Sequence, residues 1–523
     1  MADNKMVAII LFTLISLVAG DKHVCMINAC DSLKEGKLFA EEFGLELMQN
    51  MTSNLLNNLE RRIRSLEQPV WIISKENNRW LECSKGPCTC LPETKSISCW
   101  QQNIASLPSE QVIPHDVSVI DLGMNKLTTI NKDAFKHLLF LTELDLFDNQ
   151  LDYLPESVFD DLEDLKYLRL HKNFLLDFHK NIFWGLRNVK TLDISFNRLR
   201  NIPEDIFTVS QDVIMLHLSG NTLQTLPELL FNNLKYLEDL DISNNDLRYL
   251  PIGVFRDLNS LKRLNLAENQ LNAFNEGIFD TLANLEYLNL RKNRISHISR
   301  RLLGNMHNLK ILQLASNKID KLDLDTFQDL TELTELNLGQ NYILDLPEGL
   351  FIQNGKIEKL ILYSNSLVDL KEKSLMGLDN LSALLMNNNL LENIHPDVFL
   401  YAPNVQKLHL DSNKFRFLQP NTLDPLKNIT SIKMTKNQWH CDCNILYLAL
   451  WVSDNNNKLW DSQPSCRGPG DLGGKLLKNM RFQHLCEGQW ASMINLAPRI
   501  PIKHNSVKEG DKSRDSTFHK DQN

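Results

Sequence analysis

Residues Leu141–Asn188 consist of LTELDLFDNQLDYLPESVFDDLED followed by LKYLRLHKNFLLDFHKNIFWGLRN, two segments of 24 residues with the same pattern. The first contains Asn149 and the second contains Asn173 at the same place. An asparagine recurs at this spacing fourteen times without insertion or deletion, at Asn125, Asn149, Asn173, Asn197, Asn221, Asn245, Asn269, Asn293, Asn317, Asn341, Asn365, Asn389, Asn413 and Asn437. Such regular spacing predicts one small unit stacked on itself, because each unit buries its apolar face against its neighbours.

The residues around each asparagine predict a short strand. Apolar residues stand eight, five and three positions before it and two and five positions after it. Around Asn149 these residues are Leu141, Leu144, Leu146, Leu151 and Leu154. The pair at five and three positions before the asparagine alternates with polar residues, which is the period of a half-buried strand. We expect the asparagine to point inward, where neighbouring backbone groups must satisfy its amide.

A second column of apolar residues stands ten positions after the asparagines. It comprises Phe135, Phe159, Phe183, Phe207, Phe231, Phe255, Phe279, Phe327, Phe351 and Phe399, with Leu303, Leu375 and Leu423 in the three remaining places. The rings are expected to stack into an aromatic spine behind the strands.

This pattern resembles the leucine-rich repeat, in the 24-residue class typical of extracellular proteins. Toll-like receptor ectodomains, Slit proteins, small leucine-rich proteoglycans and the acid-labile subunit of growth-factor complexes belong to that class. The resemblance extends from Val117 to Asn437. It implies an α/β solenoid, a horseshoe with a parallel sheet on its concave side and a disulfide cap at each end.

All ten cysteines lie outside the repeats, and eight of them flank the repeats closely. Solenoid ends expose apolar surface, and disulfide-stapled caps suit an oxidising compartment. Spacing alone leaves three connectivities for each group of four. The family resemblance implies the pairs Cys83–Cys90, Cys88–Cys99, Cys441–Cys466 and Cys443–Cys486, and Cys25 is close enough to Cys30 to pair with it. Zinc is the alternative ligand, but C-x-C spacing is unusual for structural zinc, so no metal is expected.

The ends of the chain predict secretion. Met6–Val18 is an apolar run of the length of a secretory leader, too short to span a bilayer, and no other stretch approaches the ~18 apolar residues that a span needs. We therefore expect a protein of the extracellular space or matrix. The predicted organisation is a signal peptide (1–20), a helical extension (21–82), a cysteine cap (83–116), the repeats (117–437), a second cap (438–488) and a polar tail (489–523).

The extension before the first cap carries an amphipathic stretch. Its apolar residues, spaced mostly by four, are Phe39, Phe43, Leu47, Met51, Leu55, Leu59, Ile63 and Leu66. This spacing predicts a helix with one apolar stripe, which Pro69 would end. The helix either folds back on the amino-terminal face of the solenoid or serves as a partner helix for oligomerisation. The run lacks several regular heptads, which favours the first alternative.

Binding is expected on the concave sheet, at the residues six, four and two positions before each asparagine. Fourteen strands at ~4.8 Å make an arc of roughly 60 Å, which suits a folded protein or a polymer rather than a metabolite, and no cofactor is expected. An apolar patch stands out at Lys359, Ile361, Tyr363, Ala383 and Leu385. Weaker anchors of the same type are Phe147, Tyr167, Arg169, His171, Tyr287 and Arg291.

Two further surface features remain hypotheses. Acidic residues occupy the exposed columns of the amino-terminal half at Glu143, Asp145, Asp193, Asp239 and Asp241. They form either a patch for a basic partner or ordinary polar fillers of the strand. Glycosylation sequons begin at Asn50, Asn380 and Asn428.

Charge and motifs limit the function. A formal net charge of -9 gives no basic footprint for nucleic acid. The sequence contains no Gly-rich phosphate loop, nucleophile elbow or His-Glu-x-x-His helix, so no enzyme activity is expected. The sequence predicts a secreted binding protein for an extracellular protein or microbial ligand, with a component of the extracellular matrix or of cell adhesion as the alternative.

Overall fold

The computed structural model describes residues 42–74, 80–460 and 462–487, and the chain divides into two compact units, Met1–Arg64 and Ser65–Asn523. Helix α3 (Glu42–Leu66) accounts for the described part of the first unit, and it ends three residues before Pro69. None of the described helices is long and apolar enough to cross a bilayer. Cys25, Cys30, the predicted signal peptide and the tail 489–523 lie outside the described residues.

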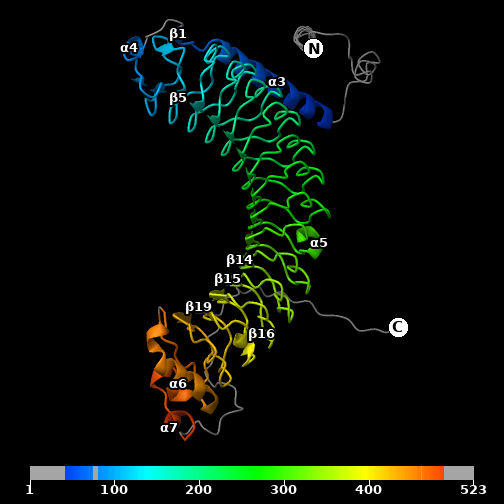
Figure 1. Cartoon of the computed structure of the whole chain (residues 1–523), viewed down its shortest axis with the longest axis vertical. Coiled ribbons are helices and arrows are strands. Elements are labelled where there is room, and N and C mark those ends of the chain that lie inside the picture. The colour runs from blue at the N-terminus through cyan, green and yellow to red at the C-terminus, as the bar shows by residue number, and fades with distance from the viewer. Residues whose placement is uncertain (1–41, 75–79, 461, 488–523) are drawn as a thin grey trace, which may run out of the picture. The chain divides into compact units, whose positions relative to one another are not determined.

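The second unit is a curved solenoid whose strands form one sheet on its inner side (Figure 1). Fourteen strands of three residues pair in parallel, each in register with the strand 24 residues away. They are β5 Val119–Asp121, β6 Glu143–Asp145, β7 Tyr167–Arg169, β8 Thr191–Asp193, β9 Met215–His217, β10 Asp239–Asp241, β11 Arg263–Asn265, β12 Tyr287–Asn289, β13 Ile311–Gln313, β14 Glu335–Asn337, β15 Lys359–Ile361, β17 Ala383–Leu385, β19 Lys407–His409 and β20 Ser431–Lys433. The horseshoe predicted from the repeat is therefore confirmed.

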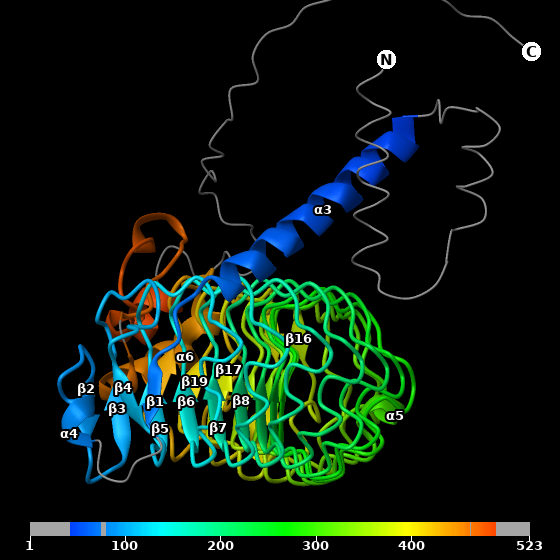
Figure 2. The same ribbon diagram turned by 90° about the horizontal axis from the view of Figure 1, so that it is seen from above.

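The first cap extends the sheet beyond the fourteen strands that the repeats predict. β2 (Thr89–Leu91) pairs antiparallel with β3 (Ser96–Ser98), and β3 pairs in parallel with β5. The sheet of the described residues thus has sixteen strands, and Figure 2 shows its amino-terminal strands side by side.

The inward asparagines form a continuous ladder of hydrogen bonds. The side-chain amide of Asn269 donates to the carbonyls of Ile242, Leu266 and Ala267 at 3.0, 3.2 and 3.3 Å. Its side-chain oxygen accepts from the amide of Leu247 at 3.1 Å. The same pattern recurs along the repeats, so each asparagine satisfies backbone groups of its own turn and of the preceding one.

The residue before each ladder asparagine has a left-handed backbone. Thirteen of these fourteen residues are not glycine, with φ between 50° and 59°, and the fourteenth is Gly220 with φ 68°. This conformation lies in the turn that follows each strand and directs the asparagine inward. Because such residues cost on the order of 1–3 kcal/mol each, the ladder bonds must offset a repeated strain.

The phenylalanine spine lies behind the sheet as predicted. Phe255 is buried between Phe231 and Phe279, with ring centroids 6.4 and 6.0 Å away. Turns make up most of the outer side of the repeats, together with the short helices α5 (Arg300–Leu303) and η1 (Val398–Tyr401). A small parallel pair, β16 (Asp369–Leu370) and β18 (Asn393–Ile394), also lies outside the main sheet.

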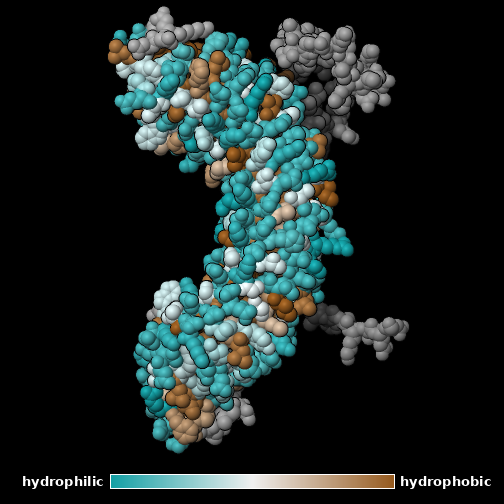
Figure 3. Space-filling model, in the orientation of Figure 1, coloured by the Kyte–Doolittle hydropathy of each residue, from teal (hydrophilic) through white to brown (hydrophobic). Residues whose placement is uncertain are grey.

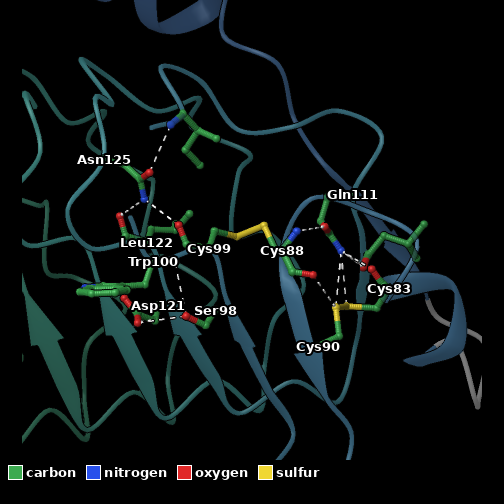
Figure 4. The surroundings of a disulfide bond; sticks show 12 residues. Cys83, Cys88, Cys90, Ser98, Cys99, Trp100, Gln111, Asp121, Leu122 and Asn125 are labelled. Atoms are coloured by element: carbon green, nitrogen blue, oxygen red, sulfur yellow. Dashed lines mark hydrogen bonds between the residues drawn. A yellow bond between two sulfur atoms is a disulfide. The ribbon is translucent and has the colours of Figure 1, made fainter. Parts of the chain in front are cut away.

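The amino-terminal cap is fastened by Cys83–Cys90 and Cys88–Cys99 (Figure 4). Gln111 is fully buried between these bonds, where its amide donates to the carbonyl of Cys83 and its oxygen accepts from the amide of Cys88. Helix α4 (Trp80–Cys83) leads into the cap, and β1 (Ile72–Ser74) pairs in parallel with β4 (Val112–Pro114). Asn125 joins the cap to the ladder by donating to the carbonyl of Cys99 at 2.8 Å.

Residues just after the helix pack onto the first repeats. The indole of Trp71 is buried, donates to the carbonyl of Ala134 and meets the ring of Phe135 edge-on at 6.1 Å. The side chain of Asn131 donates to the carbonyl of Gln68 at 2.9 Å. Trp71 therefore covers Phe135, the first ring of the spine, which is fully buried.

The carboxyl-terminal cap contains Cys441–Cys466 and Cys443–Cys486. Its elements are η2 Cys443–Ile445, α6 Leu446–Asp454, η3 Asn456–Lys458, η4 Gly470–Leu472, η5 Leu477–Asn479 and α7 Phe482–Leu485. The buried ring of Trp439 stacks on Phe415 at 6.0 Å and closes the apolar interior. These two disulfides and the two of the first cap are the pairs that the family resemblance implies.

Candidate functional site

Four of the predicted anchors lie together on the concave sheet. Phe147 follows β6, Tyr167 and Arg169 belong to β7, and His171 follows β7. We call Phe147, Tyr167, Arg169 and His171 the aromatic cluster. The rings of Phe147 and His171 stack at 5.0 Å with an angle of 15° between their planes. Tyr167 is 41% exposed, which makes it the accessible ring of the cluster.

Neighbouring side chains hold the aromatic cluster in place. The ring of Phe147 also lies over Gly123, where a Cβ atom would stand only 2.3 Å from the ring, so any side chain at this position would displace it. The guanidinium of Arg169 donates to Glu143 at 2.5 Å and to Asp145 at 2.9 Å. Because these contacts span neighbouring strands in fixed register, the cluster presents a preformed surface.

The carboxyl of Asp145, which contacts Arg169 of the cluster, has a raised pKa. Burial raises the pKa of its carboxyl above the ordinary value, and the repulsion of Asp121 adds to this. The hydrogen bond and the positive charge of Arg169 act in the opposite direction without cancelling burial. Arg169 therefore keeps Asp145 ionised at a lower pH than burial alone would allow.

Replacing Arg169 by glutamine is expected to raise the pKa of Asp145 further, because the charge that stabilises the carboxylate is lost. A raised folded-state pKa stabilises the fold below the unfolded-state pKa, and this contribution is lost as pH rises through the folded-state pKa. The variant should therefore lose stability over a wider pH range above ~4. Carboxyl carbon NMR titration measures the pKa, and Arg198→Gln, whose guanidinium lies over Phe174, should leave it unchanged. A pKa of Asp145 unaffected by Arg169→Gln would contradict this account.

The predicted apolar patch is only partly exposed. Ile361 was expected at the surface, but its side chain is buried and only 6% exposed, so that expectation is wrong. It lies between its register partners Asn337 and Leu385 on the neighbouring strands. Ala383 and Leu385 are half-buried.

Tyr363 and Lys359 are also fixed by their neighbours. The half-buried ring of Tyr363 lies over Gly339, where a Cβ atom would be 2.7 Å from the ring. The amine of Lys359 lies 3.2 Å from a carboxylate oxygen of Glu335. The patch therefore offers Tyr363 and Leu385 as contact surface, without a free charge at Lys359.

The remaining predicted anchors, Tyr287 and Arg291, lie in and just after β12, five repeats from the aromatic cluster. The guanidinium of Arg263 lies over the ring of Tyr287, 4.8 Å from its centroid. Arg291 lies 3.9 Å from Glu268. These contacts occupy one face of the Tyr287 ring and partly neutralise Arg291, so this pair is a weaker contact surface.

Most acidic side chains of the exposed columns lie close to a basic side chain on a neighbouring strand. Glu143 and Asp145 contact Arg169, and Asp239 lies 3.2 Å from Arg263. A nitrogen of His171 lies 3.2 Å from Asp193, although the geometry is not that of a hydrogen bond. These pairings favour internal cross-strand contacts over a patch that awaits a basic partner.

The sequons lie outside the concave columns. Asn380 and Asn428 are exposed, and the amide of Asn380 donates to the carbonyl of Gly355 at 2.8 Å. The same contact recurs at Asn188, Asn284, Asn308 and Asn404. Asn380 thus has a structural role that the sequon did not indicate. Asn50 lies in the part of α3 whose side chains are outside the described residues.

One residue that sequence reasoning missed is Trp460 of the second cap. Its backbone amide donates to the carbonyl of Ile432 in β20 at 3.0 Å, which brings its exposed ring to His409. The repeat could not reveal it, because Trp460 stands beyond the last ladder asparagine. No group of three His, Cys, Asp or Glu side chains in the described part of the chain is arranged to hold a metal ion.

Comparison with protein families identifies the repeat. The family model described as "Leucine rich repeat" matches residues 140–199, 187–247, 235–295, 283–343, 331–391 and 380–438. These overlapping matches cover more than half of the 523 residues.

Curated relatives match only short segments. The chain is 37% identical over 49 residues to carboxypeptidase N subunit 2 of Mus musculus, which covers 9% of each protein. It is 36% identical over 86 residues to leucine-rich repeat-containing G-protein coupled receptor 5 of Xenopus tropicalis, covering 16% of this chain and 9% of the receptor. The chain therefore matches less than a tenth of the length of these relatives.

Solved structures match over most of the chain. The Toll–Spatzle complex of Drosophila gives a TM-score of 0.60 at 22% identity, covering 73% of this chain and 57% of that one. A leucine-rich repeat protein of Leptospira interrogans gives 0.59 at 26% identity, covering 70% and 95%. TLR13 in complex with ssRNA13 gives 0.59 at 26% identity, covering 74% and 59%.

Proposed function

Because the chain belongs to the leucine-rich repeat family, we propose that it is a secreted, non-catalytic recognition protein that binds a protein or microbial ligand on its concave sheet. The observation that carries this proposal is the aromatic cluster, where Tyr167 is exposed beside the stacked rings of Phe147 and His171. Rigid aromatic groups beside an arginine are the residue types that dominate protein interfaces.

The geometry of the sheet favours a macromolecule over a small molecule. The aromatic cluster stands on a surface of parallel strands rather than in an enclosed cavity, and metabolites generally bind in concave pockets. Ordering costs are low at this surface, because the ring of Phe147 packs over Gly123 and stacks on His171, and Glu143 already holds Arg169. A folded partner could therefore gain affinity from the cluster with little rearrangement.

The relatives and the caps support an extracellular location. Toll is solved in complex with Spatzle, and one curated relative is a G-protein coupled receptor. Disulfides at both ends of the repeats suit an oxidising compartment. Secretion, glycosylation at the three sequons and oligomerisation through α3, whose Leu56 and Ile63 are exposed, remain predictions of the same proposal.

Replacing Tyr167 by alanine is expected to weaken ligand binding about tenfold or more, since an interfacial tyrosine often contributes over 1.4 kcal/mol. The purified protein serves as bait in the fluid into which it is secreted, and mass spectrometry identifies the captured partner. Affinities of the wild type and the variant for that partner are then compared. Tyr236→Ala, which removes an exposed ring outside the concave columns, is the matched control. Equal affinities for all three proteins would refute binding at the aromatic cluster.

The alternative function is a structural component of the extracellular matrix or of cell adhesion. The same bait experiment separates the two functions. A recognition protein is expected in a soluble complex, whereas a matrix component is expected in the detergent-insoluble fraction.

A further inference from the structure

The carboxyl-terminal end of the concave sheet carries an indole that comes from outside the repeats. Leu459 forms a parallel bridge with Ile432, and the amide of Trp460 donates to the carbonyl of Ile432 at 3.0 Å. The cap thus adds a short extended segment beside β20. The Trp460 side chain is 49% exposed although indoles are usually well buried, so the cap holds a large apolar ring in a fixed and accessible place.

Three basic side chains surround this ring. The amine of Lys433 lies 4.0 Å from the ring centroid, and the amine of Lys407 lies 5.0 Å from it. The ring of His409 is 5.7 Å away. Lys407 and His409 belong to β19 and Lys433 belongs to β20, where His409 and Lys433 are register partners. We call Lys407, His409, Lys433 and Trp460 the basic cluster.

Lys407 differs from the other cations in the same columns. Arg169, Arg263 and Lys359 each lie within 3.2 Å of a carboxylate oxygen. Lys407 has no carboxylate at ion-pair distance among the described residues. Its contact with Trp460 is a cation–π interaction, which supplies no anionic counterpart to the amine.

His409 supports the same conclusion. Burial lowers its pKa, and the charges of Lys407 and Lys433 lower it further, while Asp411 acts in the opposite direction. Nitrogen Nε2 of His409 has no hydrogen-bond partner among the described residues. The site therefore places two lysine charges close to a half-buried imidazole that has an unused polar atom.

The strand beside the basic cluster is apolar. Ala383 and Leu385 of β17 are the register partners of Lys407 and His409. A ligand that crosses from β17 to β19 thus meets aliphatic side chains first and then amines beside an indole. A nucleic-acid site usually has many lysine or arginine side chains along the phosphate backbone and several aromatic side chains that stack on nucleobases. The basic cluster has one such ring.

We propose that the basic cluster binds an acidic segment of the protein ligand, with a carboxylate at Lys407 and an apolar residue against Leu385 and Trp460. This inference rests on the proposed function and specifies the chemistry of the partner at one end of the sheet. A carboxylate satisfies the amine of Lys407, and the indole supplies the apolar contact that typically dominates an interface.

The test uses the full-length secreted protein and a fluorescent synthetic peptide in which a run of glutamates follows a run of leucines. Fluorescence anisotropy measures its binding. We expect saturable binding that weakens with added salt, and a loss of about tenfold in affinity for Trp460→Ala and for Lys407→Gln. Trp184→Ala and Lys427→Gln, which change an exposed indole and an exposed lysine outside the concave columns, should bind as the wild type does.

Several outcomes would overturn the proposal. The peptide could fail to bind, or it could bind Trp460→Ala and Lys407→Gln as tightly as the wild type. Single-stranded RNA or a heparin oligosaccharide could bind more tightly than the peptide and depend on the same residues, which would assign the basic cluster to a polyanion. Unchanged thermal unfolding of both variants excludes misfolding as the cause of any loss.

The proposed function and this inference fail differently. Capture that depends on Tyr167 but not on Trp460 would retain the proposed function and reject an acidic partner at the basic cluster. Peptide binding at Trp460 without any captured partner that depends on Tyr167 would retain the basic cluster and reject the role of the aromatic cluster.

Discussion

Phe255→Ala is expected to lower the free energy of unfolding by about 3–5 kcal/mol, the usual cost of removing a fully buried phenylalanine. Phe255 is fully buried, and its ring stacks between Phe231 and Phe279. Alanine leaves a cavity that a solenoid cannot fill from a distant part of the chain, because each repeat contacts only its neighbours. Urea denaturation followed by circular dichroism measures the loss.

Phe255→Leu is the matched variant for the spine. Leu303, Leu375 and Leu423 occupy the same place in other repeats and are buried there. The leucine variant should therefore lose about 1–2 kcal/mol, because a smaller cavity remains. Equal losses for alanine and leucine would show that ring stacking, rather than filled volume, provides the stability.

Asn269→Ala is expected to destabilise the protein by about 3 kcal/mol, although the side chain touches no ligand surface. The substitution leaves the amide of Leu247 without its acceptor inside the protein. The carbonyls of Ile242 and Leu266 keep a second donor each, from Asn245 and Asn293, so their loss is smaller. Most of the expected cost therefore comes from one orphaned amide.

Hydrogen exchange provides the direct measurement for the ladder. Protection of the Leu247 amide should fall strongly in Asn269→Ala, while amides several repeats away should change little. Asn272→Ala alters an exposed asparagine of the same repeat and should change neither protection nor the urea midpoint. Full protection of Leu247 in Asn269→Ala would mean that another group accepts its hydrogen bond.

Features set by the repeat register were predictable from the sequence. The ladder, the spine and the three-residue strands recur with the period of the chain, so the neighbours of Asn269 or Phe255 are the same residue types one repeat away. This period can be read from a single sequence without knowledge of the three-dimensional contacts. The unbroken register also excludes a long inserted loop between Asn125 and Asn437.

Features set by side-chain contacts between repeats were not predictable. Ile361 is buried between Asn337 and Leu385 of the neighbouring strands, and burial raises the pKa of Asp145 against the opposing effect of Arg169. Trp460 reaches the sheet through a cap segment that has no periodicity. Sequence therefore located the columns of the concave sheet, whereas the side-chain contacts within them required coordinates.

Because the register is constant, the distance between two positions along the sheet is set by the number of repeats between them. Tyr167 and Lys407 occupy the same position in β7 and β19, which lie ten repeats apart. At ~4.8 Å per strand this separation is roughly 48 Å along the sheet. A globular domain of about 100 residues, with a radius of gyration near ~13 Å, is only about 34 Å across. A partner that touches both ends at once must therefore be larger than such a domain, elongated or paired with a copy of itself, so the number of repeats selects partners by their length.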